Sequence, residues 1–414
     1  MIRQILTSLL ILSIATTHAA AEAVPVKIVP GVGIARGGDP YFVKGAAGDQ
    51  HLDELVATGG NSIRTWTTNG LLPILDAAQQ RGLTVCAGIW LEPECNWFSY
   101  SNADHCAKQT ARVKKEVTEF RDHPALLFWG LGNEAEGDGS NTAYWMQLEV
   151  LAKAVKEIDP AHPTFTAVAG LQPTKIAGLD AHTPSLDFVG INTYAALNNL
   201  RKYLAENGWK RPWVVTEYGP RGFWESPRSS WGAPIEQTSG EKAKLIRKAY
   251  QAAIQPAGDC WGGYVFLWGQ KQEATSTWFG IFTDSGESTS VRDVMNELWK
   301  NQPPPDHAPE LNKLISTAAK KEIAASSEFI AQAEATDADG DPLTYHWTLT
   351  PESAGRDAKG RERKTAALAK CLIKAEGTFA SFQAPEKPGH YRVHLRVTDN
   401  RHRAATGNFP ILVK

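Results

Sequence analysis

The chain of 414 residues is poor in several features that would each define a class of protein. Its 43 basic and 45 acidic residues give a formal net charge of −2, and no basic stripe with interleaved aromatic residues is present. A nucleic-acid partner is therefore not expected. No apolar run approaches the roughly 18 residues of a membrane-spanning helix, so an integral membrane segment is not expected either. We expect a monomer.

The N-terminal segment has the pattern of an export signal. Arg3 supplies a positive charge, an apolar run extends from Ile5 to Ala15, and the small residues HAAA follow. We expect cleavage between Ala19 and Ala23, so that residues 1–22 are a signal peptide. The mature protein is then predicted to be exported, to the periplasm or the medium.

Cysteine is scarce, with five residues in the chain, and no CxxC pair is present. Metal binding by cysteine is therefore not expected, and no cofactor is predicted. Because disulfides persist outside the cytosol, Cys95 and Cys106 are candidates for a disulfide within the polar stretch CNWFSYSNADHC. Cys86 lies in an apolar run and is interpreted as a buried thiol.

What the chain has in quantity is apolar sequence, 42% of its residues with 14 tryptophans, enough for a large core. Eight short apolar runs predict strands: Tyr41–Gly45, Asn61–Trp66, Leu83–Trp90, Ala125–Glu134, Thr164–Gly170, Asp187–Tyr194, Pro212–Gly219 and Tyr264–Gly269. Amphipathic patterns such as LLPILDAAQQRG separate most of them. Eight strand and helix pairs predict an α/β fold, a (β/α)8 TIM barrel. An open doubly wound sheet is the alternative, but no GxGxxG motif follows the first strand.

The pattern changes after the barrel. The proline-rich stretch QPPPDHAPE is followed by alternating strands such as PLTYHWTLT and HYRVHLRVTD, which indicate a small all-β immunoglobulin-like sandwich. The stretch ATDADGDPLTYHW resembles the start of polycystic-kidney-disease (PKD) and cadherin-like modules. We predict a barrel over residues 25–301, a linker over 302–309 and a sandwich over 310–414. The triplet Asp337, Asp339 and Asp341 could offer oxygen ligands to calcium, but a solvated turn is favoured.

Polar residues follow several predicted barrel strands at their carboxyl ends, where a parallel barrel places its active site. Those residues are Arg64, Glu134, Asn192, Tyr194, Glu217 and Trp268. Glu134 and Glu217 follow the apolar runs LLFWGLGN and PWVVT, and two facing carboxylates are what glycoside hydrolysis needs. Glu136 is the rival of Glu134, although its position two residues further along favours a loop.

The motifs WGLGNEAEG and WVVTEYG resemble the catalytic barrel of glycoside hydrolase family 2. More broadly, they resemble the clan of retaining (β/α)8 glycosidases that includes family 5. The resemblance covers roughly Val32 to Trp299. It implies that Glu134 is the general acid and base and that Glu217 is the nucleophile. A separation of about 5 Å between the two carboxylates and retention of anomeric configuration follow from that assignment.

The same resemblance gives roles to neighbouring residues in substrate binding. Asn133 can donate to the sugar 2-hydroxyl, while Arg64 and Tyr194 can stabilise the charge of Glu217. Trp268 can stack beneath the sugar ring. Among the tryptophans in predicted loops, Trp97 and Trp224 are interpreted as sugar platforms, with Trp231 as a third.

Family 2 members often carry β-sandwich domains before the barrel, and here almost nothing lies between the signal and the first strand. That difference favours an endo-acting enzyme, with an endo-β-glucanase as the first hypothesis. Alternatives are a β-mannanase, a β-glucan transglycosylase, or an inactive carbohydrate-binding protein. Because every predicted catalytic residue precedes Trp299, the sandwich is predicted to be separable from the chemistry.

Overall fold

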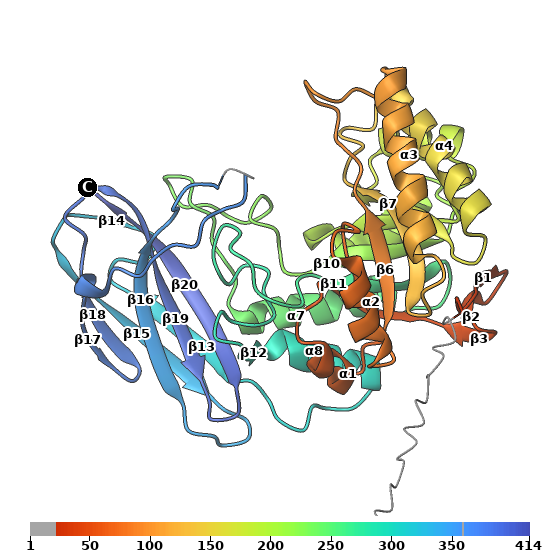
Figure 1. Ribbon diagram of the computed structural model, residues 1–414. Coiled ribbons are helices and arrows are strands. Elements are labelled where there is room, and N and C mark those ends of the chain that lie inside the picture. The colour runs from red at the N-terminus through yellow and green to blue at the C-terminus, as the bar shows by residue number, and fades with distance from the viewer. Residues whose placement is uncertain (1–21, 358–359) are drawn as a thin grey trace, which may run out of the picture.

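A computed structural model describes residues 22–357 and 360–414. The predicted signal peptide falls, except for Glu22, outside these residues. Along the chain lie a small N-terminal sheet, a barrel and a β-sandwich, the last coloured blue in Figure 1. Within the described segments, no helix is both long enough and apolar enough to span a membrane.

The central unit is a closed barrel of eight parallel strands, joined edge to edge in chain order. Its strands are β4 (Val43–Ala47), β5 (Ser62–Arg64), β6 (Thr84–Ile89), β7 (Leu126–Asn133), β8 (Thr164–Ala169), β9 (Phe188–Asn192), β10 (Trp213–Tyr218) and β11 (Cys260–Val265). The predicted fold class, a TIM barrel followed by a β-sandwich, is confirmed.

Helices alternate with these strands, as parallel pairing requires. They are α1 (Leu52–Thr58), α2 (Leu71–Gln79), α3 (Ala103–Phe120), α4 (Thr142–Ile158), α5 (Pro173–His182), α6 (Leu200–Glu206), α7 (Ser239–Ala249) and α8 (Ser290–Lys300). Local signals set several starts: the side chains of Asn102 and Asn141 cap α3 and α4, and Thr238 with Glu241 forms a capping box on α7.

Aromatic side chains fill the interior of the barrel. Phe165 and Phe188 stack at 4.8 Å between ring centroids, and Phe128 meets Phe188 edge-on at 4.9 Å. Gly45 on β4 makes room for Tyr264, because a Cβ at that position would lie 2.3 Å from the tyrosine ring. The interior of the barrel is therefore a packed core. A substrate can reach polar side chains only at the ends of the strands.

The eighth strand is the one element whose position differs clearly from the prediction. It runs from Cys260 to Val265, four residues before the predicted Tyr264–Gly269. Its sequence CWGGYV contains two glycines, which weaken the strand signal. Gly262 is required where it stands: its φ is +113°, and a Cβ there would lie 2.1 Å from the carbonyl oxygen of Val43 on β4.

Three short antiparallel strands precede the barrel: β1 (Val26–Val29), β2 (Gly33–Arg36) and β3 (Asp39–Tyr41). They contact the segments where barrel strands begin. Arg36 donates to the carbonyl of Pro124 at 2.6 Å, and the hydroxyl of Tyr41 lies 2.8 Å from Thr84 Oγ1. This sheet covers the end of the barrel opposite the carboxyl ends of the strands.

The C-terminal unit consists of two mainly antiparallel sheets around a separate core that includes Trp347 and Phe382. One sheet contains β16 (Thr344–Pro351), β19 (Gly389–Thr398) and β20 (Arg403–Val413), with β14 (Glu322–Ile323) on β20. The other contains β13 (Glu310–Ser316), β15 (Glu328–Thr336), β18 (Phe379–Gln383) and β17 (Leu372–Glu376).

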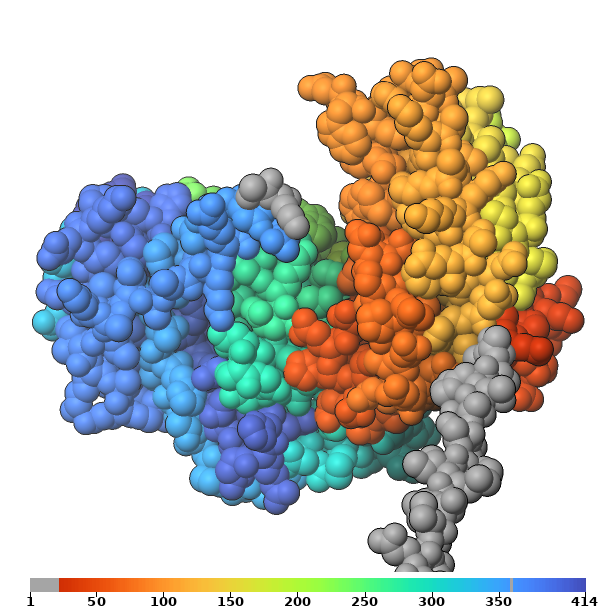
Figure 2. Space-filling model, viewed as in Figure 1, coloured from red at the N-terminus to blue at the C-terminus, as the bar shows by residue number. Residues whose placement is uncertain are grey.

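The barrel and the sandwich share a sheet. Strand β12 (Ser288–Thr289) precedes α8 and pairs in parallel with Arg403 and Ala404 of β20. Next to it, Arg403 forms an ion pair with Asp293 of α8, and the backbone N–H of Ala308 donates to the same aspartate at 2.8 Å. The molecular surface is hollowed between the orange segment that carries α3 and the blue sandwich (Figure 2).

Candidate active site

The end of β7 places an acid at the mouth of the barrel. Gly132 and Glu134 both have positive φ, +81° and +53°, so the chain turns sharply where the strand ends. Glu134 N donates to the carbonyl of Ala167 at 2.8 Å, which fixes this turn on β8. A non-glycine residue in the left-handed region is uncommon and costs energy. The turn carries the Glu134 side chain into the pocket.

Glu134 has surroundings that suit a proton donor. Desolvation by the surrounding protein raises its pKa, and the negative charges of Glu217 and Glu136 raise it further. A hydrogen bond from Asn192 Nδ2 to Glu134 Oε1, at 2.8 Å, opposes that shift. The net effect is a raised pKa, which keeps the proton on the carboxyl group to a higher pH than usual.

Glu217, on β10, is buried at 6% exposure and receives three donors. Arg64 Nη1 and Trp66 Nε1 both donate to its Oε1 at 2.8 Å. The hydroxyl of Tyr194 donates to Oε2 at 2.9 Å, and the pKa of Tyr194 is raised by its burial and by the adjacent carboxylate. The three donors hold the Glu217 carboxylate in one orientation, with the Arg64 guanidinium in direct contact with it.

A hydrogen-bond chain joins the two glutamates. Arg64 Nη2 donates to Asn133 Oδ1 at 2.6 Å, and Asn192 Nδ2 donates to the same oxygen at 3.1 Å. Thr216 orients Asn192 by donating to its Oδ1 at 2.7 Å. With Oδ1 occupied, Asn133 Nδ2 has no partner among the described residues. It is the group through which Asn133 can donate to a substrate.

These residues line a pocket of about 820 Å³ at the carboxyl ends of the strands. Glu134, Glu217, Asn133, Asn192 and Tyr194 belong to its wall, as does Trp224, which is half exposed. The remaining wall residues come mainly from loops: Trp66, Ala169, Gly170, Gln172, Thr193, Ala196, Glu225, Phe266, Leu267, Lys271 and Glu273. Arg64 lies beneath this wall, 2% exposed.

Three predicted platforms, Trp268, Trp97 and Trp231, do not line this pocket, and Trp231 lines a different hollow with Arg228 and Pro234. Trp268 is fully buried and donates to the carbonyl of His51 at 3.2 Å, because β11 ends at Val265 and the residue belongs to the loop beyond it. Its assignment as a sugar platform is wrong. Phe266 takes the position on the pocket wall. Trp97 is 67% exposed in the segment after β6 and does not line the pocket.

Local contacts decide two further expectations, the role of Glu136 and the disulfide between Cys95 and Cys106. Glu136 is buried and paired with Lys175 Nζ at 2.6 Å, so it is a structural residue and not the acid. Cys95 and Cys106 are free thiols, and Cys106 Sγ lies 3.3 Å from the carbonyl of Tyr100; the predicted disulfide is not formed.

The aspartate triplet forms the turn that was favoured. Asp337 Oδ1 accepts the backbone N–H groups of Asp339 and Asp341. Throughout the described ranges, no group of three or more His, Cys, Asp or Glu side chains could hold a metal ion.

Sequence reasoning missed several groups that complete the site. Trp66 ends the predicted strand Asn61–Trp66 and received no role there, yet it bonds directly to the buried carboxylate of Glu217. Thr216 precedes Glu217 on β10, and a hydroxyl inside an apolar strand is a signal that could have found it. Phe266, Lys271 and Glu273 follow a strand whose end was misplaced, so no pattern pointed to them.

The fold and the site together define a class, a (β/α)8 barrel with two glutamates at the carboxyl ends of its strands. Residues 68–226 match the family model described as "Glycosyl hydrolases family 2, TIM barrel domain". No curated protein sequence matches the chain significantly. The predicted resemblance to this family's barrel is confirmed for that segment, whereas the PKD character of the sandwich stays a prediction.

Solved structures give the same fold at low sequence identity. A β-glucuronidase from Bacteroides uniformis matches with a TM-score of 0.53 and 13% identity, over 94% of this chain and 48% of its own. A GH2 β-galacturonidase from Eisenbergiella tayi matches with 0.53 and 18%, over 68% and 55%. A β-D-glucuronidase from Dictyoglomus thermophilum matches with 0.52 and 17%, over 68% and 54%. The chain spans about half the length of these proteins.

Proposed function

We propose that this chain hydrolyses β-glycosidic bonds in a neutral oligosaccharide or polysaccharide, with retention of configuration. The observation that carries the proposal is the unequal setting of the two glutamates. Glu217 receives three donors on a buried carboxylate, whereas Glu134 has a raised pKa and one amide donor. One group is thus suited to attack the anomeric carbon and the other to protonate the leaving oxygen.

The two steps follow from these positions. Glu217 Oε attacks the anomeric carbon while Glu134 gives its proton to the departing glycosidic oxygen, and a glycosyl-enzyme ester forms. Glu134, now ionised, takes a proton from water, which attacks the same carbon and releases Glu217. Asn133 Nδ2 can donate to the sugar hydroxyl beside the reacting carbon. This contact strengthens as charge develops there.

The charge of the pocket favours a neutral sugar. Four glutamates line it, Glu134, Glu217, Glu225 and Glu273, and in that wall Lys271 is the one cation among the described residues. Lys271 is already paired with Glu273 at 2.7 Å. With Glu134 carrying its proton and Arg64 beside Glu217, the carboxylates of Glu217, Glu225 and Glu273 still outnumber the two cations, and a uronate carboxylate would meet this excess of negative charge. A β-glucan is our first candidate, and a β-mannan is the second.

Azide rescue tests the assignment of the nucleophile. Glu217→Ala should abolish turnover of an activated aryl β-glucoside, and added azide should restore cleavage and yield the α-glycosyl azide. Glu225→Ala, which removes another pocket carboxylate, is the matched control and should keep turnover without azide. Proton NMR of wild-type hydrolysis should show the β-anomer first. Initial α-product would contradict Glu217 as nucleophile.

A substrate panel tests the sugar class. Wild-type protein should cleave at least one of the β-1,3, β-1,4, β-1,6 and mixed-linkage glucans or β-mannans faster than any β-uronide. Products longer than the substrate would indicate transglycosylation. If no glycan is cleaved although one binds, the inactive carbohydrate-binding alternative is correct.

We also propose that the protein is exported, on the basis of the N-terminal pattern. N-terminal sequencing of the protein recovered from the native host tests this. The mature chain should begin between Ala20 and Ala23. Recovery of a chain that keeps residues 1–19 would contradict export by cleavage.

A further inference from the structure

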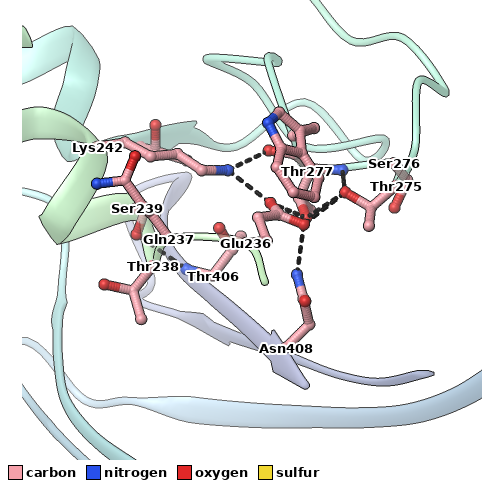
Figure 3. Close-up of polar contacts among 12 residues, drawn as sticks. Glu236, Gln237, Thr238, Ser239, Lys242, Thr275, Ser276, Thr277, Thr406 and Asn408 are labelled. Carbon is pink, nitrogen blue, oxygen red and sulfur yellow. Dashed lines mark hydrogen bonds and ion pairs between the residues drawn. The ribbon is translucent and has the colours of Figure 1, made fainter. Parts of the chain in front are cut away.

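Glu236 is a buried carboxylate outside the pocket wall, at a point where four segments of the chain meet. This residue stands in the loop between β10 and α7, and its side chain is fully enclosed. Figure 3 shows it between Lys242 of α7, Thr275 and Thr277 of the loop after β11, and Asn408 of β20. None of these residues touches the reacting groups. Thr275 and Thr277 belong to a segment that lines the pocket elsewhere, Lys242 bonds to that segment, and Asn408 reaches it only through Glu236.

The hydrogen bonds of Glu236 are complete. Oε1 accepts Lys242 Nζ at 2.6 Å and Thr277 Oγ1 at 2.9 Å. Oε2 accepts Thr275 Oγ1 at 2.6 Å and Asn408 Nδ2 at 2.6 Å. A carboxylate offers about four acceptor positions, and all are used here. Burial by itself would raise the pKa of Glu236, but the charge and hydrogen bond of Lys242, the hydrogen bond from Thr275 and the charge of Arg392 lower it to about 2.

Residues Lys271–Thr277, which we call the pocket loop, lie between this cluster and the active site. Lys271 and Glu273 line the pocket at one end of the loop, and Thr275 and Thr277 bind Glu236 at the other. Lys242 Nζ also donates to the carbonyl of Thr277 at 2.6 Å. The position of the pocket wall is thus tied to the position of Glu236.

The sandwich contacts the same loop and the same carboxylate. Asn408 Oδ1 accepts Arg392 Nη1 at 2.6 Å, which orients its amide toward Glu236. Arg392 is 1% exposed and donates to the carbonyl of Pro234 at 2.8 Å. Independently, Glu362 of the sandwich accepts the backbone N–H of Ala274 at 2.8 Å, where the pocket loop has a φ of +58°.

We propose that Glu236, Asn408 and Glu362 are positioning residues that hold the pocket loop, and that the C-terminal sandwich is thereby part of the active-site architecture. This differs from the separable module that the sequence predicts. The polar anchors of the loop include one direct bond from the sandwich, to Glu362, and one indirect link, from Asn408 through Glu236. The consequence for catalysis rests on the proposed function, but the consequence for the loop does not.

Amide hydrogen exchange tests the loop directly. In Asn408→Ala and in Glu362→Ala, peptides covering residues 271–277 should exchange at least about fivefold faster than in the wild type. Glu362→Gln keeps an oxygen acceptor for Ala274 N–H and should restore the wild-type rate. Lys364→Ala is the matched control, since it removes an ion pair between the sandwich and Asp284 without touching the pocket loop.

Steady-state kinetics on the best substrate test the catalytic consequence. Asn408→Ala and Glu362→Ala should each raise KM threefold or more while changing kcat less, because the loop lines the pocket and does not supply the reacting groups. Lys364→Ala and Glu362→Gln should leave both constants within about twofold. Thermal unfolding of each variant separates these effects from lost stability.

The outcomes are distinguishable. Wild-type exchange in both alanine variants would overturn the proposal, whether or not the protein hydrolyses any glycan. Faster exchange with unchanged KM and kcat would overturn the link to the active site. If Asn408→Ala does not fold, Glu362→Ala, which changes a partly exposed side chain, decides both points. If the wild type cleaves nothing, the proposed function fails and the exchange result still stands.

Discussion

At the scale of single residues, Trp66 is the most informative side chain in the site. It combines a ring on the pocket wall with an N–H group that donates to Glu217 at 2.8 Å. A donor to a charged, buried group contributes more than a neutral pair, about 1.5–3 kcal/mol. Loss of the Trp66 donor should therefore slow the step in which Glu217 reacts.

Trp66→Phe keeps most of the ring and removes the donor. We expect kcat to fall about tenfold or more, with a smaller change in KM, because 1.4 kcal/mol corresponds to a factor of about ten. Trp224→Phe is the control, since Trp224 lines the same pocket without bonding to either carboxylate. Steady-state rates on an aryl β-glycoside measure both. Equal effects in the two variants would contradict a specific role for the Trp66 donor.

The raised pKa of Glu134 predicts the alkaline side of the pH profile. The acid form must donate the first proton, so kcat/KM should fall as pH rises through the pKa of Glu134. Asn192 lowers that pKa by donating to the ionised form. Removing the donor in Asn192→Ala should therefore raise the pKa and move the alkaline limb to higher pH.

A pH profile of kcat/KM for Asn192→Ala against the wild type measures this shift. The absolute rate should also drop, since Asn192 contacts Asn133 as well. Gln172→Ala, in the pocket wall but bonded to neither glutamate, should leave the limb in place. An alkaline limb that moves to lower pH in Asn192→Ala would mean that another group controls it.

The residue-level predictions succeeded where strand order alone decides position. Arg64, Asn133, Asn192, Tyr194 and Glu217 meet in space because parallel strands of a closed barrel end at one mouth. Their functional roles remain predictions. Trp66, Phe266 and Trp224 depend on how loops fold back over that mouth, which no periodicity encodes. Trp268 was assigned to the mouth because β11 was predicted four residues too far along the chain, whereas the residue is buried in the loop beyond the strand.

At the scale of elements, β11 closes the barrel between β10 and β4, and its glycines hid it from sequence analysis. Apolar runs identified the seven other strands, and several of these, such as β7 and β10, contain consecutive branched or aromatic residues. The N-terminal strands β1–β3 were missed because they are short and partly exposed. A short, polar-edged sheet has no distinguishing pattern.

Gly262→Ala tests the closure of the barrel at β11. The new methyl group would collide with the carbonyl of Val43, and the backbone would have to hold a φ of +113°. We expect a loss of more than about 2 kcal/mol in the free energy of unfolding, measured by urea denaturation. Gly240→Ala, on α7 with its nearest atoms at 3.8 Å, should be neutral or stabilising. Equal stability of the two variants would contradict this account.

At the scale of the whole molecule, the contact between barrel and sandwich was beyond the reach of sequence. A proline-rich stretch after α8 is typical of a spacer. No pattern in it predicts that Arg403 forms an ion pair with Asp293, which lies about a hundred residues earlier in the chain. Glu236 is paired with Lys242 inside the barrel and Arg392 with Glu352 inside the sandwich. The buried pair of Arg403 and Asp293, in contrast, joins the two units, and separating them would leave both charges without this partner.

We therefore expect barrel and sandwich to unfold as one cooperative unit. Scanning calorimetry should show a single transition whose van't Hoff and calorimetric enthalpies agree. A second transition, removed by ending the chain at Asn301, would show that the units are thermodynamically independent. The variant Lys364→Ala should leave the shape of the transition unchanged, because it removes only an exposed pair.

The short strand β12 has a further consequence. An exposed strand edge is a template for pairing with other chains, and β20, eleven residues long, would present one on the side away from β19. β12 pairs with Arg403 and Ala404, Ser239 Oγ accepts the N–H of Thr406, Pro410 has no N–H to offer, and β14 pairs with the far end. Two of these four features that block the edge, β12 and Ser239, belong to the barrel. A sandwich excised from this chain would lose them and expose an edge prone to aggregation.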